Sequence, residues 1–324
     1  MMKGKRKPAE RILALLALLG WVAGAAEAAE SETEAMARAR AANQAKDYAT
    51  SLAIYQEWSQ RGSGAATTFL GMMYWRGLGV PQNHPQACDV FEQAEKRSDP
   101  YGTELLADCY FHGDGRTLDY GRSAALYSRA SERGAPQADC ALGNQYLQGL
   151  GVSKDPAKAF SLCSKSAERG VADAQTDLGQ MYLDGTGTER NPVQAAVWFQ
   201  KAMDQGQGNA ALLLGKMRWN GDGVERNHDQ AASAWLIAAQ RGNRSAPALL
   251  AKYYFAASIV ENTKEIRVAP ATKAIYWATL ATRADPEPAA RQESQKLIDM
   301  LLGVAPTLKE RADRLLEGPG VPAL

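Results

Sequence analysis

The chain has 324 residues, of which 45% are apolar, and its formal net charge is +1 at pH 7. This balanced charge argues against a dedicated nucleic-acid binder, because such proteins carry a marked basic excess. Beyond the first residues, no run approaches the roughly 20 apolar residues that a membrane-spanning helix needs. We therefore expect a folded protein that binds no nucleic acid and has no membrane span once it is mature.

Residues 1–28 have the three parts of a secretory signal peptide. A basic head over residues 3–11 precedes an apolar stretch over residues 12–22, and small residues such as Ala26 and Ala28 follow it. The alternative is an uncleaved anchor, for which the apolar stretch is short. Since no cysteine follows that could carry a lipid, we predict a cleaved signal and a periplasmic or secreted protein.

The chain then repeats with a period of 36 residues. The clearest marker is a leucine, which recurs as Leu70, Leu106, Leu142, Leu178, Leu214 and Leu250. Glycine or alanine follows each of these leucines, and tyrosine stands four residues after all of them except one, where Arg218 replaces it. A fixed period of this length is typical of a solenoid, so we predict an all-α fold of stacked helix-turn-helix repeats.

The third copy shows how one repeat is built. Leu142 and Tyr146 lie on one apolar stripe of a first helix. Gly149 and Gly151 then supply positive φ for a turn, and Asp155 caps a second helix. The glycine after the leucine lies inside the first helix, where it costs up to ~1 kcal/mol relative to alanine. Its recurrence predicts the close approach of a neighbouring helix.

The repeats divide the mature chain into four parts. Residues 29–62 read as a degenerate N-terminal capping repeat, and residues 63–242 hold five full copies. Residues 243–283 form an atypical sixth copy with an insertion, a longer and partly charged segment through Pro270 that precedes Lys273 and Ala274. Residues 284–324 contain two more helical stretches, about 288–302 and 306–316, which we expect to cap the array, followed by a tail.

The order Leu-Gly-x-x-Tyr-x-x-Gly-x-Gly-Val over residues 142–152, with Asp-Pro-x-Lys-Ala at 155–159 and Ala-Glu-Arg-Gly at 167–170, resembles the Sel-one-like repeat. This family is related to the tetratricopeptide repeats, and the resemblance covers nearly the whole mature chain. It implies a right-handed αα superhelix that acts as an adaptor for protein complexes. Exported bacterial members are linked to envelope assembly, to host interaction or, in a cysteine-rich subgroup, to the binding of penicillin-like compounds.

Four cysteines in an exported chain favour two disulfides, although four allow three connectivities. Antiparallel helix geometry places Cys88 level with Cys109 and Cys140 level with Cys163, so we expect these two pairs. The alternative is four buried free thiols. The cysteine-rich subgroup places its pairs at other positions of the repeat, which argues against its penicillin-binding function here.

No metal-ligand spacing, phosphate loop or hydrolase motif stands out, and no lysine has a serine three residues before it. His84 and His228 occupy equivalent positions after an N-cap, which indicates a structural role. The aromatic residues Trp75, Phe111, Trp219 and Phe255 adjoin the leucine stripe, so we expect them in the core. We predict no catalysis, no cofactor and no metal.

The first helices also carry two rows of variable polar positions opposite the leucine stripe. The rows are Met72, Asp108, Asn144, Gln180, Lys216 and Lys252, and Arg76, His112, Gln148, Asp184 and Asn220. First helices line the concave face of related solenoids, so we predict that a monomer binds a protein or peptide there. The alternatives are a solvated face without a ligand, a penicillin-binding or β-lactamase-like protein, and a structural subunit of an envelope export or exopolysaccharide machine.

Overall fold

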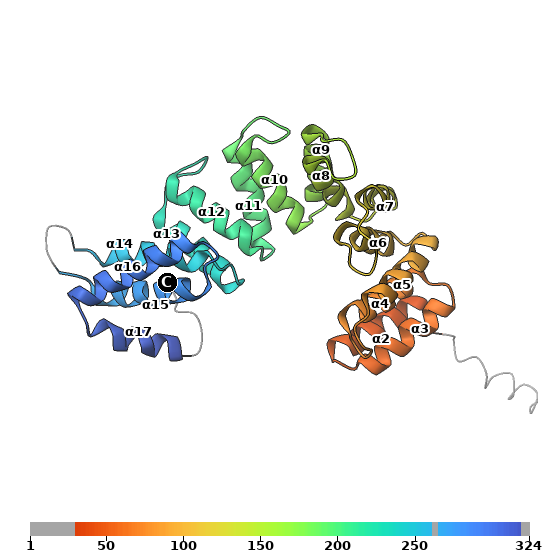
Figure 1. Ribbon diagram of the computed structural model, residues 1–324, viewed down its shortest axis with the longest axis horizontal. Helices are drawn as coiled ribbons and strands as arrows, with labels where there is room; N and C mark the ends of the chain where they lie inside the picture. Colours follow the sequence, from red (N-terminus) through yellow and green to blue (C-terminus); the bar gives the residue numbers. More distant parts are fainter. Residues whose placement is uncertain (1–29, 261–264, 319–324) are drawn as a thin grey trace, which may run out of the picture. The chain divides into compact units, whose positions relative to one another are not determined.

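The computed structural model describes residues 30–260 and 265–318, which fold into helices without any β-strand (Figure 1). The predicted signal peptide, residues 1–28, lies outside the described residues. The chain divides into two compact units, Met1–Leu118 and Asp119–Leu324. The regular spacing of the repeats does not indicate this division.

Helices in both units have the same length in most cases, 13 residues. The first unit contains α2 (Glu32–Gln44), α3 (Tyr48–Gln60), α4 (Gly64–Arg76), α5 (His84–Lys96) and α6 (Pro100–His112). The second unit contains α7 (Tyr120–Glu132), α8 (Ala138–Gln148), α9 (Pro156–Glu168), α10 (Ala172–Asp184), α11 (Pro192–Asp204), α12 (Gly208–Asn220), α13 (His228–Gln240), α14 (Ala246–Ser258), α15 (Val268–Ala284), α16 (Pro288–Val304) and α17 (Leu308–Glu317).

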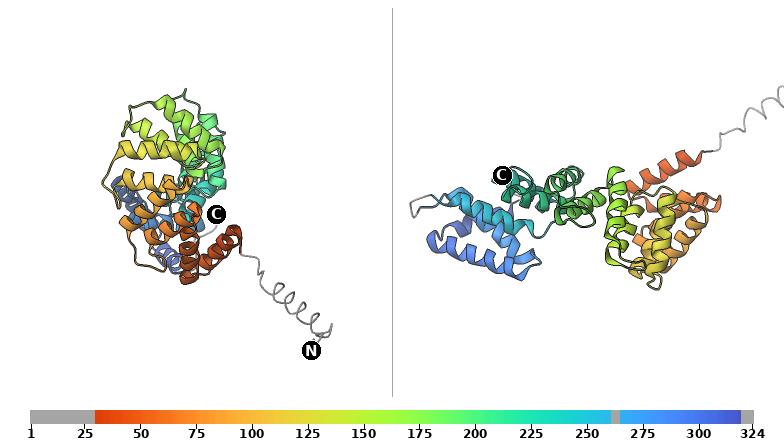
Figure 2. Two further views of the ribbon diagram at one scale, coloured as in Figure 1. Left: turned by 90° about the vertical axis from the view of Figure 1, so that its right-hand side faces the viewer. Right: turned by 90° about the horizontal axis from the view of Figure 1, so that it is seen from above.

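Neighbouring helices form antiparallel hairpins, each of which packs on the next within its unit (Figure 2). The most extensive pairings are those of a first helix with its own second helix, such as α4 with α5 and α8 with α9. The predicted all-α fold of 36-residue helix hairpins is therefore confirmed.

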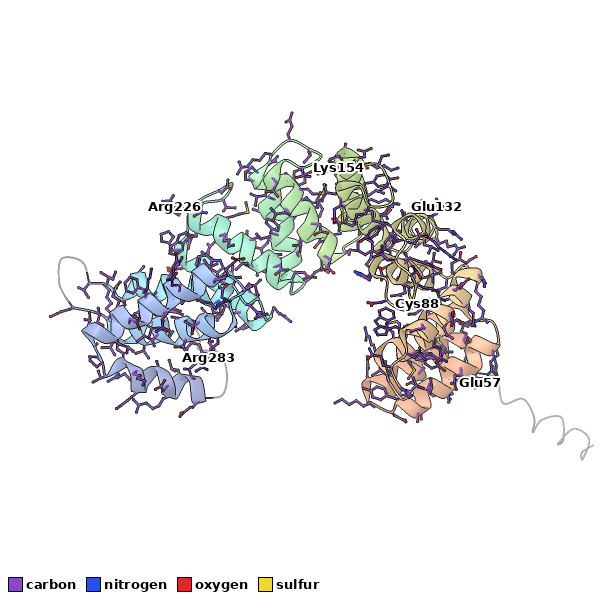
Figure 3. All side chains as sticks on the ribbon, viewed as in Figure 1. Glu57, Cys88, Glu132, Lys154, Arg226 and Arg283 are labelled. Atoms are coloured by element: carbon purple, nitrogen blue, oxygen red, sulfur yellow. A yellow bond between two sulfur atoms is a disulfide. The ribbon has the colours of Figure 1, made fainter. Side chains whose placement is uncertain are left out.

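The predicted turn after each first helix is present. In the third copy Gly149 and Gly151 have φ of 75° and 70°. A side chain on Gly151 would also clash, because an added Cβ would lie 2.3 Å from the carbonyl carbon of Tyr120 at the start of α7. Asp155 accepts a hydrogen bond from the backbone N–H of Lys158, and its own N–H donates to the carbonyl of Tyr146 at 2.8 Å. Figure 3 shows Lys154 in this loop, between α8 and α9.

The glycine inside the first helix packs against an aromatic ring of the second helix, as its recurrence predicted. An added Cβ on Gly71 would lie 2.4 Å from Phe91, and one on Gly215 would lie 2.4 Å from Trp235. In the third copy a cysteine takes the place of the ring, and the Sγ atom of Cys163 lies 3.0 Å from the same point. The ring and the glycine are therefore complementary in size.

The second helix of the sixth repeat begins earlier than the sequence pattern indicated. This helix, α15, begins at Val268, so Pro270, which was expected in the segment before the helix, lies inside its first turn. Proline is tolerated there because the N–H groups of the first turn have no intrahelical partner. The last two helices, α16 and α17, both pack on α15, with Leu301 and Leu308 buried (Figure 1).

Candidate functional site

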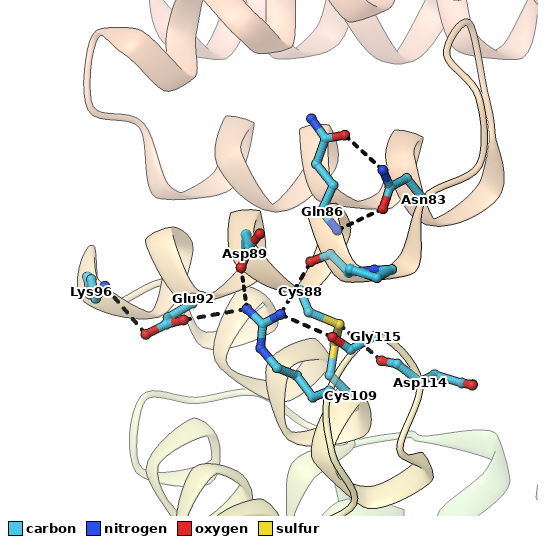
Figure 4. Close-up of polar contacts among 11 residues, drawn as sticks. Asn83, Gln86, Cys88, Asp89, Glu92, Lys96, Cys109, Asp114 and Gly115 are labelled. Atoms are coloured by element: carbon cyan, nitrogen blue, oxygen red, sulfur yellow. Dashed lines mark hydrogen bonds and ion pairs between the residues drawn. A yellow bond between two sulfur atoms is a disulfide. The ribbon is translucent and has the colours of Figure 1, made fainter.

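The four cysteines form the two disulfides expected from the sequence. Cys88 on α5 is bonded to Cys109 on α6, and Cys140 on α8 is bonded to Cys163 on α9 (Figure 4 shows the first pair). No cysteine is left as a free thiol. Since disulfides persist in oxidising compartments, the pairs indicate that the protein works outside a reducing cytoplasm.

Ten of the eleven side chains predicted to bind a partner line three grooves between successive first helices. Met72, Arg76, Asp108 and His112 line one groove; Asn144, Gln180 and Asp184 line a second; Lys216, Asn220 and Lys252 line a third. Gln148 is exposed at the end of α8 and lines none of the three. Within each unit, the residues of the two variable rows thus line grooves on the face formed by the first helices.

We name each groove after one residue. The Trp75 groove, about 270 Å³, is lined by Met72, Trp75, Arg76, Phe91, Leu105, Asp108 and His112. The Trp219 groove, about 210 Å³, is lined by Lys216, Trp219, Asn220, Trp235, Leu249 and Lys252. The Asp177 groove, about 120 Å³, is lined by Asn144, Leu147, Asp177, Gln180, Met181, Asp184 and Thr186.

The aromatic stripe is half-buried rather than fully buried, and although Trp219 and Phe255 pack against the core, Trp75 and Trp219 also line grooves. One face of Trp75 stacks on His84, with ring centroids 4.2 Å apart, and Trp219 stacks on His228 at 4.1 Å. These histidines therefore have the expected structural role, since each stacks on a tryptophan that lines a groove and is not itself part of that lining.

The sequence contains a signal for the stacking of tryptophan on histidine, which the search for constant positions in the repeat did not use. Tryptophan at this position of the first helix occurs in the same two copies that have histidine nine residues later, at Trp75 with His84 and at Trp219 with His228. The copies with Leu147 or Leu183 have proline at the histidine position. Co-occurrence of the two rings could have indicated a stacked pair.

The Asp177 groove contains an acidic residue that the two polar rows did not include. Asp177 is half-buried and accepts a hydrogen bond from the side-chain amide of Asn144 at 3.1 Å. Burial raises the pKa of Asp177, the Asn144 hydrogen bond opposes the shift, and the nearby charge of Asp173 adds to it. Leucine occupies the equivalent position in the Trp75 and Trp219 grooves, so the repeat pattern gave no indication of a carboxyl group there.

Another perturbed carboxyl lies one turn from Asp108. Burial and, to a smaller extent, the charge of Asp108 raise the pKa of Glu104 to about 7. The Oε2 atom of Glu104 is buried without a hydrogen-bond partner among the described residues. The carboxyl is therefore held near the balance between its neutral and charged forms at neutral pH.

A fully buried carboxylate, Asp139, ties the third repeat to the second. It pairs with Lys165 at 2.8 Å and with Arg169 at 3.3 Å, and it accepts a hydrogen bond from the hydroxyl of Ser131. Arg169 also donates to the carbonyl of Gly134. The hydroxyl of Ser131 is thus engaged by a carboxylate that two cations neutralise, which is an arrangement for structure rather than for nucleophilic attack.

Two observations bear on metals and membranes. Within residues 30–260 and 265–318, the potential metal ligands that lie together are Cys140, Cys163 and Asp177, and the two thiols are already joined as a disulfide. In the same part of the chain, no helix combines the length and the apolar character that crossing a membrane requires.

Comparison with known proteins places these features in a family. The Sel1 repeat model matches residues 64–99, 100–134, 136–171, 172–207 and 208–243. No curated protein matches the chain.

One solved structure shows a similar fold, and a second shows a weaker similarity. A Sel1 repeat protein from Oxalobacter formigenes is 23% identical, with a TM-score of 0.64, over 78% of this chain and 99% of its own. A protective antigen present in uropathogenic Escherichia coli strains, displaying an SLR fold, is 24% identical, with a TM-score of 0.49, over 91% of this chain and 73% of its own. Sel1 repeats generally form non-enzymatic scaffolds for protein–protein interaction. The chain belongs to the Sel1 repeat family.

Proposed function

We propose that this protein is an exported, monomeric scaffold without catalytic activity, which binds a protein or peptide partner on the face formed by its first helices. We expect this to be the concave face of the repeat array. The proposal rests mainly on one observation, that ten of the eleven residues at the variable positions of the first helices line the three grooves.

The contrast between constant and variable positions supports a binding role for these grooves. Leu178, Leu214 and Leu250 are all buried, and their shared role in the core explains why leucine recurs at this position. The groove-lining positions lie on the same helices but change in charge and size from copy to copy. Packing does not require that variation, whereas recognition of an asymmetric partner does.

The disulfides support the proposal that the protein is exported. Two disulfides close loops of 21 and 23 residues, and they stabilise the fold only where thiols stay oxidised. We therefore propose that the signal-like residues 1–28 direct the chain to the periplasm or beyond, and that its partner is found there.

Photo-crosslinking tests the binding face. A photoreactive amino acid is placed at Asp184 or at Asn220, which line two different grooves, and the protein is irradiated with the periplasmic and secreted proteins of its source. A matched control carries the same group at Val197, which is exposed on the second helix α11. We expect one specific adduct from the groove positions and none from Val197. Adducts that form equally from all three positions, or only from Val197, would refute the proposed face.

A further inference from the structure

We propose that the Trp219 groove binds a large apolar side chain of the partner that stands next to acidic residues. The inference rests on the proposed binding role of the first-helix face and names the chemistry of its ligand. It follows from comparing the Trp219 groove with the Trp75 groove, which has the same floor and a different rim.

The floors of the two grooves are built from equivalent residues. Trp219 corresponds to Trp75, since both come five residues after the repeat leucine and both stack on a histidine. A second ring from the second helix completes each floor: Trp235 lies 5.3 Å from Trp219, and Phe91 lies 6.3 Å from Trp75, measured between ring centroids. An aromatic floor whose tryptophan is also stacked on a histidine is suited to an apolar anchor side chain.

The size of the Trp219 groove limits the ligand to one such anchor. Its volume of about 210 Å³ is below the roughly 300–1,000 Å³ of pockets that enclose a whole small molecule. The third apolar wall is Leu249, which comes from α14 while Trp219 comes from α12. A single aromatic or long aliphatic side chain can therefore enter between two successive first helices.

The rims of the two grooves differ in charge. Lys216 and Lys252 stand on the rim of the Trp219 groove, where the equivalent residues of the Trp75 groove are Met72 and Asp108. Both lysines are exposed. Lys252 pairs with Glu293 at 2.7 Å, but both side chains of this pair are more than half exposed, so a ligand carboxylate can replace Glu293 at little cost.

Charge complementarity therefore favours particular ligand residues next to the inserted apolar side chain. Two ammonium groups beside an apolar groove attract carboxylates that flank the inserted side chain and repel cations there. No acidic side chain is part of the Trp219 groove lining, where the exposed Glu293 pairs with Lys252 alone of the two lysines, whereas the lining of the Trp75 groove contains Asp108 together with Arg76. The ligand class is thus an acidic segment with an embedded aromatic or aliphatic residue.

Three short peptides test this specificity on the folded protein. They are blocked at both ends and have the sequences Gly-Asp-Phe-Glu-Gly, Gly-Asn-Phe-Gln-Gly and Gly-Lys-Phe-Lys-Gly. Binding is followed by NMR through the indole N–H signals of Trp219 and Trp75, which Trp→Phe variants assign. At the Trp219 signal we expect the acidic peptide to bind roughly tenfold more tightly than the neutral one, and the basic peptide to bind most weakly. The preference should shrink in 0.5 M salt, because the charges are exposed.

Two double variants separate the rim from the floor. Lys216→Met with Lys252→Gln should abolish the preference while the neutral peptide still binds. Met72→Lys with Asp108→Lys should create an acidic preference at the Trp75 signal. Circular dichroism checks that each variant remains folded.

Three results would overturn the inference: equal binding of the acidic and neutral peptides at Trp219, a preference that survives loss of both lysines, or no shift of the Trp219 signal with any peptide. The proposed function would stand in each case if the crosslinks from Asp184 and Asn220 form, because those crosslinks do not depend on the charge of the ligand.

Discussion

Gly215→Ala tests the packing reason for the glycine inside the first helix. In an unconstrained helix this change is favourable by up to ~1 kcal/mol, because alanine is the better helix former. Here an added Cβ would lie 2.4 Å from Nε1 and 2.5 Å from Cδ1 of Trp235. Ordinary contacts between carbon atoms begin at about 3.5 Å, so the indole has to move by roughly 1 Å.

The surroundings make that movement costly. Trp235 is 2% exposed, so the ring is packed on nearly all sides, and its Nε1 donates to the carbonyl of Leu212 at 3.3 Å. Overpacking costs typically ~1–3 kcal/mol, and weakening the hydrogen bond adds about 0.5–1.5 kcal/mol. After the gain in helix propensity, we expect Gly215→Ala to lower the free energy of unfolding by about 1–3 kcal/mol.

Urea unfolding followed by far-UV circular dichroism measures the effect, with midpoint and slope compared between variants, because a repeat array can lose two-state behaviour. Gly303→Ala on α16 is the matched control, since nothing lies within 4 Å of its added Cβ, and this change should stabilise the protein slightly. Gly143→Ala should cost less than Gly215→Ala, because its nearest neighbours are 3.0 Å away. The packing argument fails if Gly215→Ala raises the midpoint as Gly303→Ala does.

Three further outcomes are expected from the same unfolding measurement. Replacing both Cys140 and Cys163 by serine should cost ~3 kcal/mol in the chain-entropy model for a closed loop of 23 residues, and an unchanged midpoint would contradict it. The pKa of Glu104, raised to about 7 from 4.5 by burial and then by Asp108, means that the folded state binds the proton more tightly than the unfolded chain does. The free energy of unfolding should therefore fall as pH rises from about 4.5 to 7 and stay reduced at higher pH. Glu104→Gln should raise the free energy of unfolding by up to ~3 kcal/mol over wild type at pH 8 and by almost nothing at pH 4. Equal gains at both pH values would exclude the ionisation of Glu104 as the cause. Ser98 has φ of 61°, where the other repeats have glycine, so Ser98→Gly should stabilise by roughly 1 kcal/mol, and a loss of stability would show that the residue is not strained.

The regular part of the fold was predictable because each of its features is local. The N-cap at Asp155 and the positive φ of Gly149 and Gly151 depend on a few neighbouring residues, and their residue types indicate them directly. The glycine of the first helix required one further step, since its cost in a helix implies a compensating contact. The structure identified that contact as a ring of the second helix.

Features that depend on residues from two different repeats were harder to predict from the sequence. The polar rows were found because they share a helical phase, but the depth of the grooves between first helices depends on side chains 30 or more residues apart, such as Trp219 and Leu249. Asp177 was missed for the same reason, because the pattern of its position in other copies is apolar. Trp75, which we expected in the core, stacks on His84 and forms part of the floor of a groove.

The sequence by itself determined the repeat length, the helices and their caps, the pairing of the cysteines and the face that carries the variable residues. It did so because these properties follow from spacing and from residue type within one hairpin or, for Cys88 and Cys109, between adjacent helices of successive repeats. Only the tertiary structure decided which of those residues meet, namely that two tryptophans open onto grooves, that their rims carry different charges, and that the chain divides after Leu118. These depend on how one hairpin packs on the next, and that packing is the sum of contacts between side chains that are distant in sequence.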